Sequence, residues 1–184
     1  MDRREALHRT AGILGVTLIG SELFLSACMR KVTANELISA ADVLLLDEVG
    51  ETILPETERS PGAKAAKIGL FIKSIVTDCY GKKEQEIFKL GILQLHQLAR
   101  NHYGGDFMAI NSNQKHAILN QLDKEARSST VKNDLHFFRM IKELTLWGYF
   151  SSEPGATIAL RYSAVPGRYE GCVPYTTGDK AWAT

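Results

Sequence analysis

Apolar residues recur at helical spacing along most of the chain between residues 31 and 150. The clearest case lies between residues 68 and 79, where apolar side chains three or four positions apart fall on one face of a helix. They are Ile68, Phe71, Ile72, Ile75, Val76 and Cys79. Strict alternation of apolar and polar residues, the pattern of a half-buried strand, is nearly absent. The pattern predicts an all-α, bundle-like domain of about five helices.

Start and stop signals set the expected helix boundaries. Thr33-Ala-Asn-Glu36 has the form of a capping box and predicts a first helix from there to Leu54, before Pro55. Gly81 is the expected C-cap of the second helix. Three more helices are expected at about 83–102, 113–127 and 131–147, the third of the five ending before Gly104. Their expected core residues are Phe88, Ile92, Leu95 and Ala99, with Leu90 and Leu98 beside them, then Ile118, Leu119, Leu122 and Ala126, and finally Leu135, Phe138, Ile141 and Leu144.

The composition changes after Gly148, which divides a helical domain, residues 28–150, from an extended tail, residues 151–184. Residues 147–184 hold seven aromatic residues, three of the five prolines and no helical period. Disordered tails are usually poor in aromatic residues, so this segment is expected to pack on a protein surface. It packs either on its own helical domain or on a partner protein, because interfaces are enriched in Tyr and Trp. The candidate partner-binding residues are Tyr149, Phe150, Tyr162, Pro166, Tyr169, Tyr175 and Trp182.

Residues 1–27 have the pattern of a cleaved export signal. Basic residues precede an apolar run, at about 11–24, that is shorter than the roughly 20 residues needed to span a bilayer. The alternative is a buried first helix, which three glycines in nine residues disfavour. The adjacent Arg3 and Arg4 resemble a twin-arginine signal, the route that exports folded proteins, although Asp2, Ala6 and His8 depart from its usual pattern. The general secretion route is therefore kept as an alternative.

The three cysteines divide into one candidate lipid site and one candidate disulfide. Leu25-Ser-Ala-Cys28 follows the apolar run and looks like a bacterial lipobox, so Cys28 is the expected lipid attachment point. Met29 after it mildly favours the outer membrane over the inner membrane. In an oxidising compartment such as the periplasm, Cys79 and Cys172 then form a candidate disulfide. The alternative is two independent buried thiols.

Charge and motifs narrow the function classes. The chain has 22 basic and 21 acidic residues, and this balance argues against a nucleic-acid-binding protein. It contains no dinucleotide-binding, P-loop, metalloprotease or haem-attachment motif. The histidines of the expected mature chain, His96, His102, His116 and His136, form no ligand-like pair. The sequence therefore predicts neither catalytic residues nor a metal site.

Four segments resemble one known family. They read LDEVGETILPET (46–57), SPGA (60–63), FFRMIKELTLWGYFSSEPG (137–155) and PGRYEGCVP (166–174). In this combination the chain is similar to the gluconate 2-dehydrogenase subunit 3 family, and the most specific part is the stretch from about 144 to 155.

The resemblance implies a non-catalytic small subunit of a periplasmic oxidoreductase complex. In this family the chemistry belongs to a large subunit of the glucose–methanol–choline type, which carries FAD and oxidises a sugar, sugar acid or glycoside. A cytochrome c subunit or another acceptor takes the electrons. The small subunit carries the export signal for its partner and stays bound to it, which favours the docking role of the tail. The alternatives are a free-standing periplasmic lipoprotein that binds a ligand or envelope component, and an enzyme in its own right.

Overall fold

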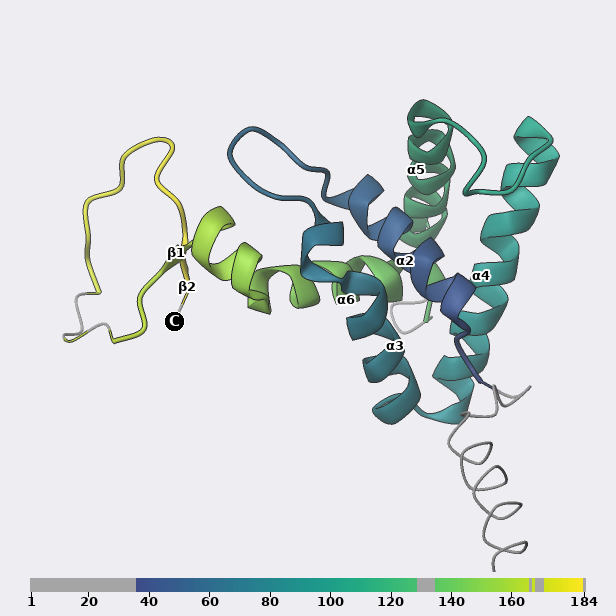
Figure 1. Ribbon diagram of the computed structural model, residues 1–184, viewed down its shortest axis with the longest axis horizontal. Helices are drawn as coiled ribbons and strands as arrows, with labels where there is room; N and C mark the ends of the chain where they lie inside the picture. Colours follow the sequence, from purple (N-terminus) through teal and green to yellow (C-terminus); the bar gives the residue numbers. More distant parts are fainter. Residues whose placement is uncertain (1–35, 129–134, 166, 168–170, 184) are drawn as a thin grey trace, which may run out of the picture. The chain divides into compact units, whose positions relative to one another are not determined.

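The computed structural model describes residues 36–128, 135–165, 167 and 171–183, and these residues are mainly helical (Figure 1). The chain divides into two units, residues 1–36 and 37–184, and the elements below belong to the second. Its α-helices are α2 (Ala40–Ile53), α3 (Ile68–Asp78), α4 (Lys82–Tyr103), α5 (Ser112–Ser128) and α6 (Phe137–Ser151). A 3₁₀ turn, η1 (Ala63–Ala66), precedes α3, and a single π turn, η2 (Gly155–Ala159), follows α6. The all-α prediction is confirmed.

The helix α2 begins later than the sequence predicted. Its N-cap is Ser39, whose hydroxyl accepts from the Asp42 amide at 3.2 Å while the Asp42 carboxylate accepts from the Ser39 amide at 2.8 Å. The capping box is therefore Ser39–Asp42, and the expected start at Thr33–Glu36 is wrong, because Glu36 lies outside the helix. Ile38 and Val43, on either side of the cap, are buried at the positions of a hydrophobic staple. The end before Pro55 is as predicted.

The junction between α3 and α4 corrects the expected role of Gly81. Gly81 is the N-cap of α4. The helix α3 ends at Asp78, and its C-cap is Cys79, which has right-handed helical dihedral angles. No left-handed glycine is needed there, because the Gln85 side-chain amide donates to the carbonyl oxygens of Val76, Thr77 and Tyr80 at 3.0–3.2 Å. A side chain from the next helix thus satisfies carbonyl groups at the end of α3.

The core contains most of the residues that the helical spacing predicted. Phe71, Ile75 and Leu98 pack against it partly buried, and Cys79, at the end of the predicted stripe, is exposed. In α4 and α5 the buried set includes Phe88, Ile92, Leu95, Ala99, Ile118, Leu119, Leu122 and Ala126. Leu90 is an exception at 64% exposed, because it is two residues from both Phe88 and Ile92 and so lies on the opposite side of the helix. Leu135 is also exposed, because it precedes the first turn of α6. The helix α4 ends at Gly104 in the left-handed conformation, φ 73°, where the sequence placed its stop.

None of the described helices is both long enough and apolar enough to cross a lipid bilayer. The predicted export signal, with Arg3, Arg4 and Cys28, lies outside the described residues.

Candidate docking surface

The C-terminal half of α6 presents two aromatic side chains to solvent. Its inward face, which includes Ile141, Leu144 and Gly148, belongs to the core. Trp147 is 58% exposed, and Phe150, one turn further on, is also exposed. The indole of Trp147 meets the ring of Phe71 from α3 edge to face, with centroids 5.3 Å apart and planes at 87°. This contact holds the indole against the domain while most of its surface faces water.

Tyr149 lies between these two aromatic residues in sequence but belongs to the core. It is 3% exposed, and its hydroxyl lies 2.5 Å from both the Ser60 hydroxyl and the Pro61 carbonyl oxygen. The predicted partner-binding role of Tyr149 is therefore corrected: the helix turns this side chain inward, onto the loop between α2 and η1. Its ring also meets that of Phe150 edge to face at 5.2 Å, so it supports an exposed neighbour.

The turn after α6 requires a glycine. Gly155 is buried, and a Cβ atom at this position would lie 1.8 Å from the carbonyl oxygen of Tyr149. The close approach lets the π turn fold back on the end of α6, where the Ser152 hydroxyl donates to the Tyr149 carbonyl at 2.6 Å. The chain thus leaves α6 in a fixed direction and enters the C-terminal segment.

The C-terminal segment closes into a loop through a two-stranded parallel ladder. The strand β1 (Arg161–Tyr162) pairs with β2 (Trp182–Ala183), and Arg161 lies opposite Trp182. The backbone amides of Arg161 and Ser163 donate to the carbonyl oxygens of Ala181 and Ala183 at 2.8 and 3.1 Å. The Lys180 ammonium donates to the carbonyl oxygen of Ile158 in η2, which attaches the second strand to the π turn.

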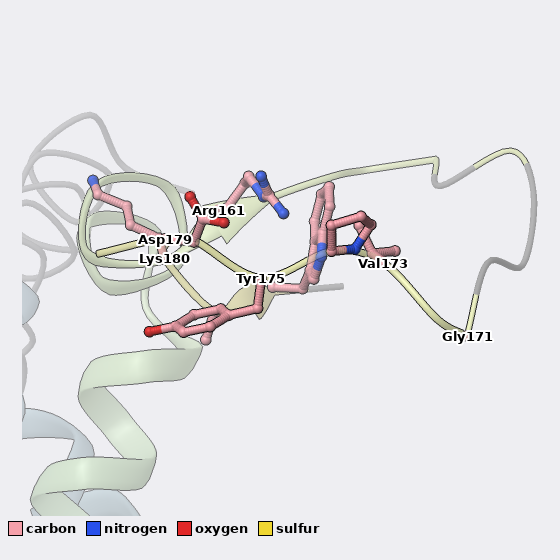
Figure 2. Close-up of a pocket in the computed structure, with 9 residues that line it drawn as sticks. Arg161, Gly171, Val173, Tyr175, Asp179 and Lys180 are labelled. Carbon is pink, nitrogen blue, oxygen red and sulfur yellow. The ribbon is translucent and has the colours of Figure 1, made fainter. Parts of the chain in front are cut away.

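This loop encloses an open hollow of about 570 Å³ (Figure 2). Arg161, Val173, Tyr175, Asp179 and Lys180 are among the side chains that line it. The guanidinium carbon of Arg161 lies 3.7 Å from the centre of the Trp182 ring. Tyr162, Tyr175 and Trp182 are all exposed, Tyr175 at 76%. A tail packed on its own helical domain would bury these rings, so their exposure favours the alternative in which they bind a partner.

We call the exposed aromatic side chains of α6 and the loop the aromatic surface. It consists of Trp147, Phe150, Tyr162, Tyr175 and Trp182. The partner-binding residues expected from the sequence did not include Trp147, although it is one of the seven aromatic residues of the segment 147–184. The sequence also gave no signal for Arg161, whose stacking on Trp182 depends on a ladder between residues 21 positions apart. Pro166 and Tyr169 lie outside the described residues.

The two remaining cysteines are not joined in the structure. Cys79 and Cys172 are both free and exposed. The alternative of two buried thiols is therefore wrong, and the disulfide stays a prediction for the oxidised protein.

Burial raises the pKa of the Tyr80 hydroxyl, and the other shifted pKa values in the described residues belong to ion pairs of the helical domain. Hydrogen bonds from Lys115 and then Lys64 hold the pKa of the Glu48 carboxyl below its ordinary value, against the opposing effect of burial. Lys115 lies 2.7 Å and Lys64 2.5 Å from the Glu48 carboxylate. This cluster joins α2, α5 and η1, which is a structural role. Among the described residues, no group of three His, Cys, Asp or Glu side chains is placed to hold a metal ion.

Comparison with known proteins identifies the family. The model of the family described as gluconate 2-dehydrogenase subunit 3 matches residues 40–167. The match begins with α2 and extends past β1, so it includes all the described α-helices, and Trp147, Phe150 and Tyr162. No curated protein and no solved structure matches the chain. With more than half of its length matched, the chain belongs to the gluconate 2-dehydrogenase subunit 3 family.

Proposed function

We propose that this chain is the non-catalytic small subunit of a periplasmic, FAD-dependent dehydrogenase that acts on a sugar, sugar acid or glycoside. In this proposal the flavin belongs to a large partner subunit, and a cytochrome c subunit is a further candidate component. The small subunit binds the large subunit, accompanies it through export and stabilises it. No chemical step is assigned to the residues of this chain.

The aromatic surface is the observation that carries this proposal. A helical body with a complete core of its own still exposes two large rings on α6 and three more on the loop that follows. Trp and Tyr are enriched among the residues that dominate binding energy at protein interfaces. Three of the five rings lie within the segment that matches a dehydrogenase subunit family.

The export part of the proposal is supported by the first 28 residues. Arg3 and Arg4 stand ahead of a weakly apolar run that ends in a lipobox-like sequence at Cys28. A twin-arginine signal on a bound small subunit would allow a folded, flavin-loaded partner to cross the membrane. A lipid on Cys28 would then hold the complex at the membrane surface.

Co-purification from the native cell tests the binding role. An affinity tag after Thr184, on a short linker, should retain a larger protein in about equal amount, and the eluate should show the absorption bands of oxidised flavin. A chain that elutes alone, or with a small molecule and no flavoprotein, would support the free-standing lipoprotein instead. A tagged unrelated lipoprotein from the same cell serves as the control for non-specific capture.

Fractionation tests the escort role. Arg3→Lys combined with Arg4→Lys preserves the positive charge and should leave both subunits in the cytoplasm. Arg9→Lys, a matched change outside the arginine pair, should leave export unchanged. Normal export of the large subunit alongside the double variant would contradict the escort role while leaving the binding role intact.

A further inference from the structure

Arg161 and Trp182 form a stacked pair at the mouth of the loop. The parallel register places the two residues opposite each other, and the guanidinium lies over the indole ring at 3.7 Å from its centre. In Figure 2 the Arg161 side chain lies higher in the view than Tyr175, which lines the lower part of the hollow. A guanidinium stacked on an aromatic face keeps its N–H groups at the edge of its plane, where they remain free to donate.

The other charged side chains of the hollow, Asp179 and Lys180, have hydrogen-bond partners in the loop and in η2. The Asp179 carboxylate accepts from the Thr176 amide at 2.9 Å, and the Lys180 ammonium donates to the Ile158 carbonyl oxygen. Arg161 has no hydrogen bond or ion pair from its guanidinium within the part of the chain that the structure describes. Among the described residues, the hollow therefore combines a guanidinium that has no hydrogen bond or ion pair with apolar walls that include Val173 and Pro174.

We propose that the Arg161–Trp182 pair binds a carboxylate group on an extended segment of the dehydrogenase partner. This inference rests on the proposed function and names the chemistry of its binding site. The planar guanidinium matches a carboxylate through two parallel N–H···O bonds, and the indole keeps that plane in a fixed orientation. Tyr175 and Pro174 offer apolar contacts to the residues beside the carboxylate, and aromatic side chains such as Tyr175 are typical of grooves for extended peptides.

The make-up of the hollow favours a protein carboxylate over an anionic lipid surface. Lipid headgroups are recognised by clusters of several basic residues, each contributing about 1 kcal/mol. Here Arg161 and Lys180 are accompanied by Asp179, and Lys180 is engaged by a backbone carbonyl. A single oriented guanidinium between apolar walls instead suits one carboxylate in a defined position.

The position of the pair in the chain suggests that it sets partner choice. The family match ends at residue 167, so Arg161 lies inside it while Trp182 and the lining from Gly171 onward lie beyond it. The helical body and the rings of α6 lie inside the matched segment. In this proposal the carboxylate subsite adds a contact that is completed by residues beyond the matched segment.

Capture of the flavoprotein by full-length variants tests the inference. Arg161→Gln should weaken binding of the partner about tenfold or more, because it removes the cation and leaves the partner carboxylate unpaired. Arg127→Gln, which removes an exposed arginine of α5, should bind like the wild type. Equal capture by wild type and Arg161→Gln would overturn the inference and leave the proposed function standing, whereas no flavoprotein with the wild type would overturn both.

A cross-linking experiment identifies the group that Arg161 meets. In Arg161→Lys the new amine can be joined by a carbodiimide to a carboxylate in direct contact, and mass mapping then locates the link. We expect a link from position 161 to an Asp, Glu or C-terminal carboxylate of the large subunit. A link only to Asp179 of the same chain, or no link in a complex that still forms, would contradict the inference. The same holds if anionic vesicles, and not the flavoprotein, retain the wild type better than Arg161→Gln.

Discussion

The hydroxyl of Tyr149 donates a hydrogen bond to the carbonyl oxygen of Pro61, with the two oxygen atoms 2.5 Å apart, and so joins α6 to a loop 88 residues earlier. The Ser60 hydroxyl lies 2.5 Å from the same phenolic oxygen. The loop is also held from its other side, because the Glu51 carboxylate accepts from the amides of Glu56 and Lys64, each at 2.9 Å. The ring of Tyr149 in turn supports Phe150 of the aromatic surface.

Tyr149→Phe should reduce stability without reducing partner binding. The change removes a buried hydroxyl and leaves the Pro61 carbonyl without this donor, which costs about 1–2 kcal/mol in the free energy of unfolding. Urea denaturation measures the loss. Tyr162→Phe removes an exposed hydroxyl and should stay within about 0.5 kcal/mol of the wild type. Weakened flavoprotein capture by Tyr149→Phe at unchanged stability would restore a direct partner role for this residue.

Gly69→Ala should destabilise the contact between α2 and α3. A Cβ atom at residue 69 would lie 2.2 Å from the Val43 carbonyl oxygen, and the Gly69 amide donates to the Asp47 carboxylate at 2.7 Å. Since a backbone atom blocks the new methyl group, the helices must separate, and we expect a loss of about 1–3 kcal/mol. Thermal or urea unfolding measures it. Gly105→Ala is the matched control, because its Cβ would meet nothing nearer than 3.7 Å; equal stability of the two variants would contradict the packing argument.

Trp147→Ala should weaken partner binding far more than it weakens the fold. The exposed indole has the character of an interface anchor, and such residues contribute about 2 kcal/mol or more to binding, roughly a thirtyfold change in Kd. Leu93→Ala provides a control, because Leu93 is also about half exposed but lies on α4. The measurement is titration of the purified large subunit with each variant. Equal affinities for Trp147→Ala and wild type would remove α6 from the docking surface.

Glu48 should contribute to acid sensitivity. Its pKa in the folded chain is lowered from 4.5, first by the hydrogen bond from Lys115, so its carboxylate stabilises the fold above the unfolded-state pKa. That contribution is lost as the pH falls through the lower folded-state pKa. Asp106 and Asp123, whose pKa values are also lowered by cationic partners, add to the same slope.

Glu48→Gln tests this contribution through the free energy of unfolding between pH 7 and pH 3. The variant should be roughly 1–3 kcal/mol less stable at neutral pH, because Lys115, whose side chain is 10% exposed, loses its counter-charge. Its stability should also fall less steeply with acid than that of the wild type. Glu58→Gln, a matched change at an exposed position, should leave the profile as it is. Parallel profiles for Glu48→Gln and wild type would show that the ion pair has no such effect.

The predicted disulfide between Cys79 and Cys172 is tested by comparing chain that is held in the cytoplasm with chain that has been exported. Chain held in the cytoplasm should show two alkylatable thiols at Cys79 and Cys172, because both are exposed. Exported chain should give one linked peptide pair in non-reducing mass mapping, and a loop of this length stabilises by up to about 4–5 kcal/mol in the chain-entropy model. Free thiols at both positions in the exported chain would contradict the predicted disulfide.

The sequence determined the helices and their inward faces, because side chains three and four positions apart lie on one face whatever surrounds the helix. At the helix ends the sequence offered competing local signals, and contacts in the folded chain decided which of them sets the boundary. Ser39 and Asp42 formed the cap, and the Gln85 side chain, supplied by the next helix, took over the role expected of Gly81. One sequence pattern is compatible with several alternative helix caps, and the contacts in the folded chain decide which cap forms.

For the aromatic surface too, the sequence predicted one part and the tertiary structure decided the rest. Composition alone predicted that the tail packs on a protein surface, because its high content of Tyr and Trp can be read from the sequence. Only the tertiary structure turned Tyr149 inward onto Pro61, left Trp147 exposed beside Phe71, and paired Arg161 with Trp182. These outcomes depend on contacts between residues far apart in the chain, about which local periodicity carries no information.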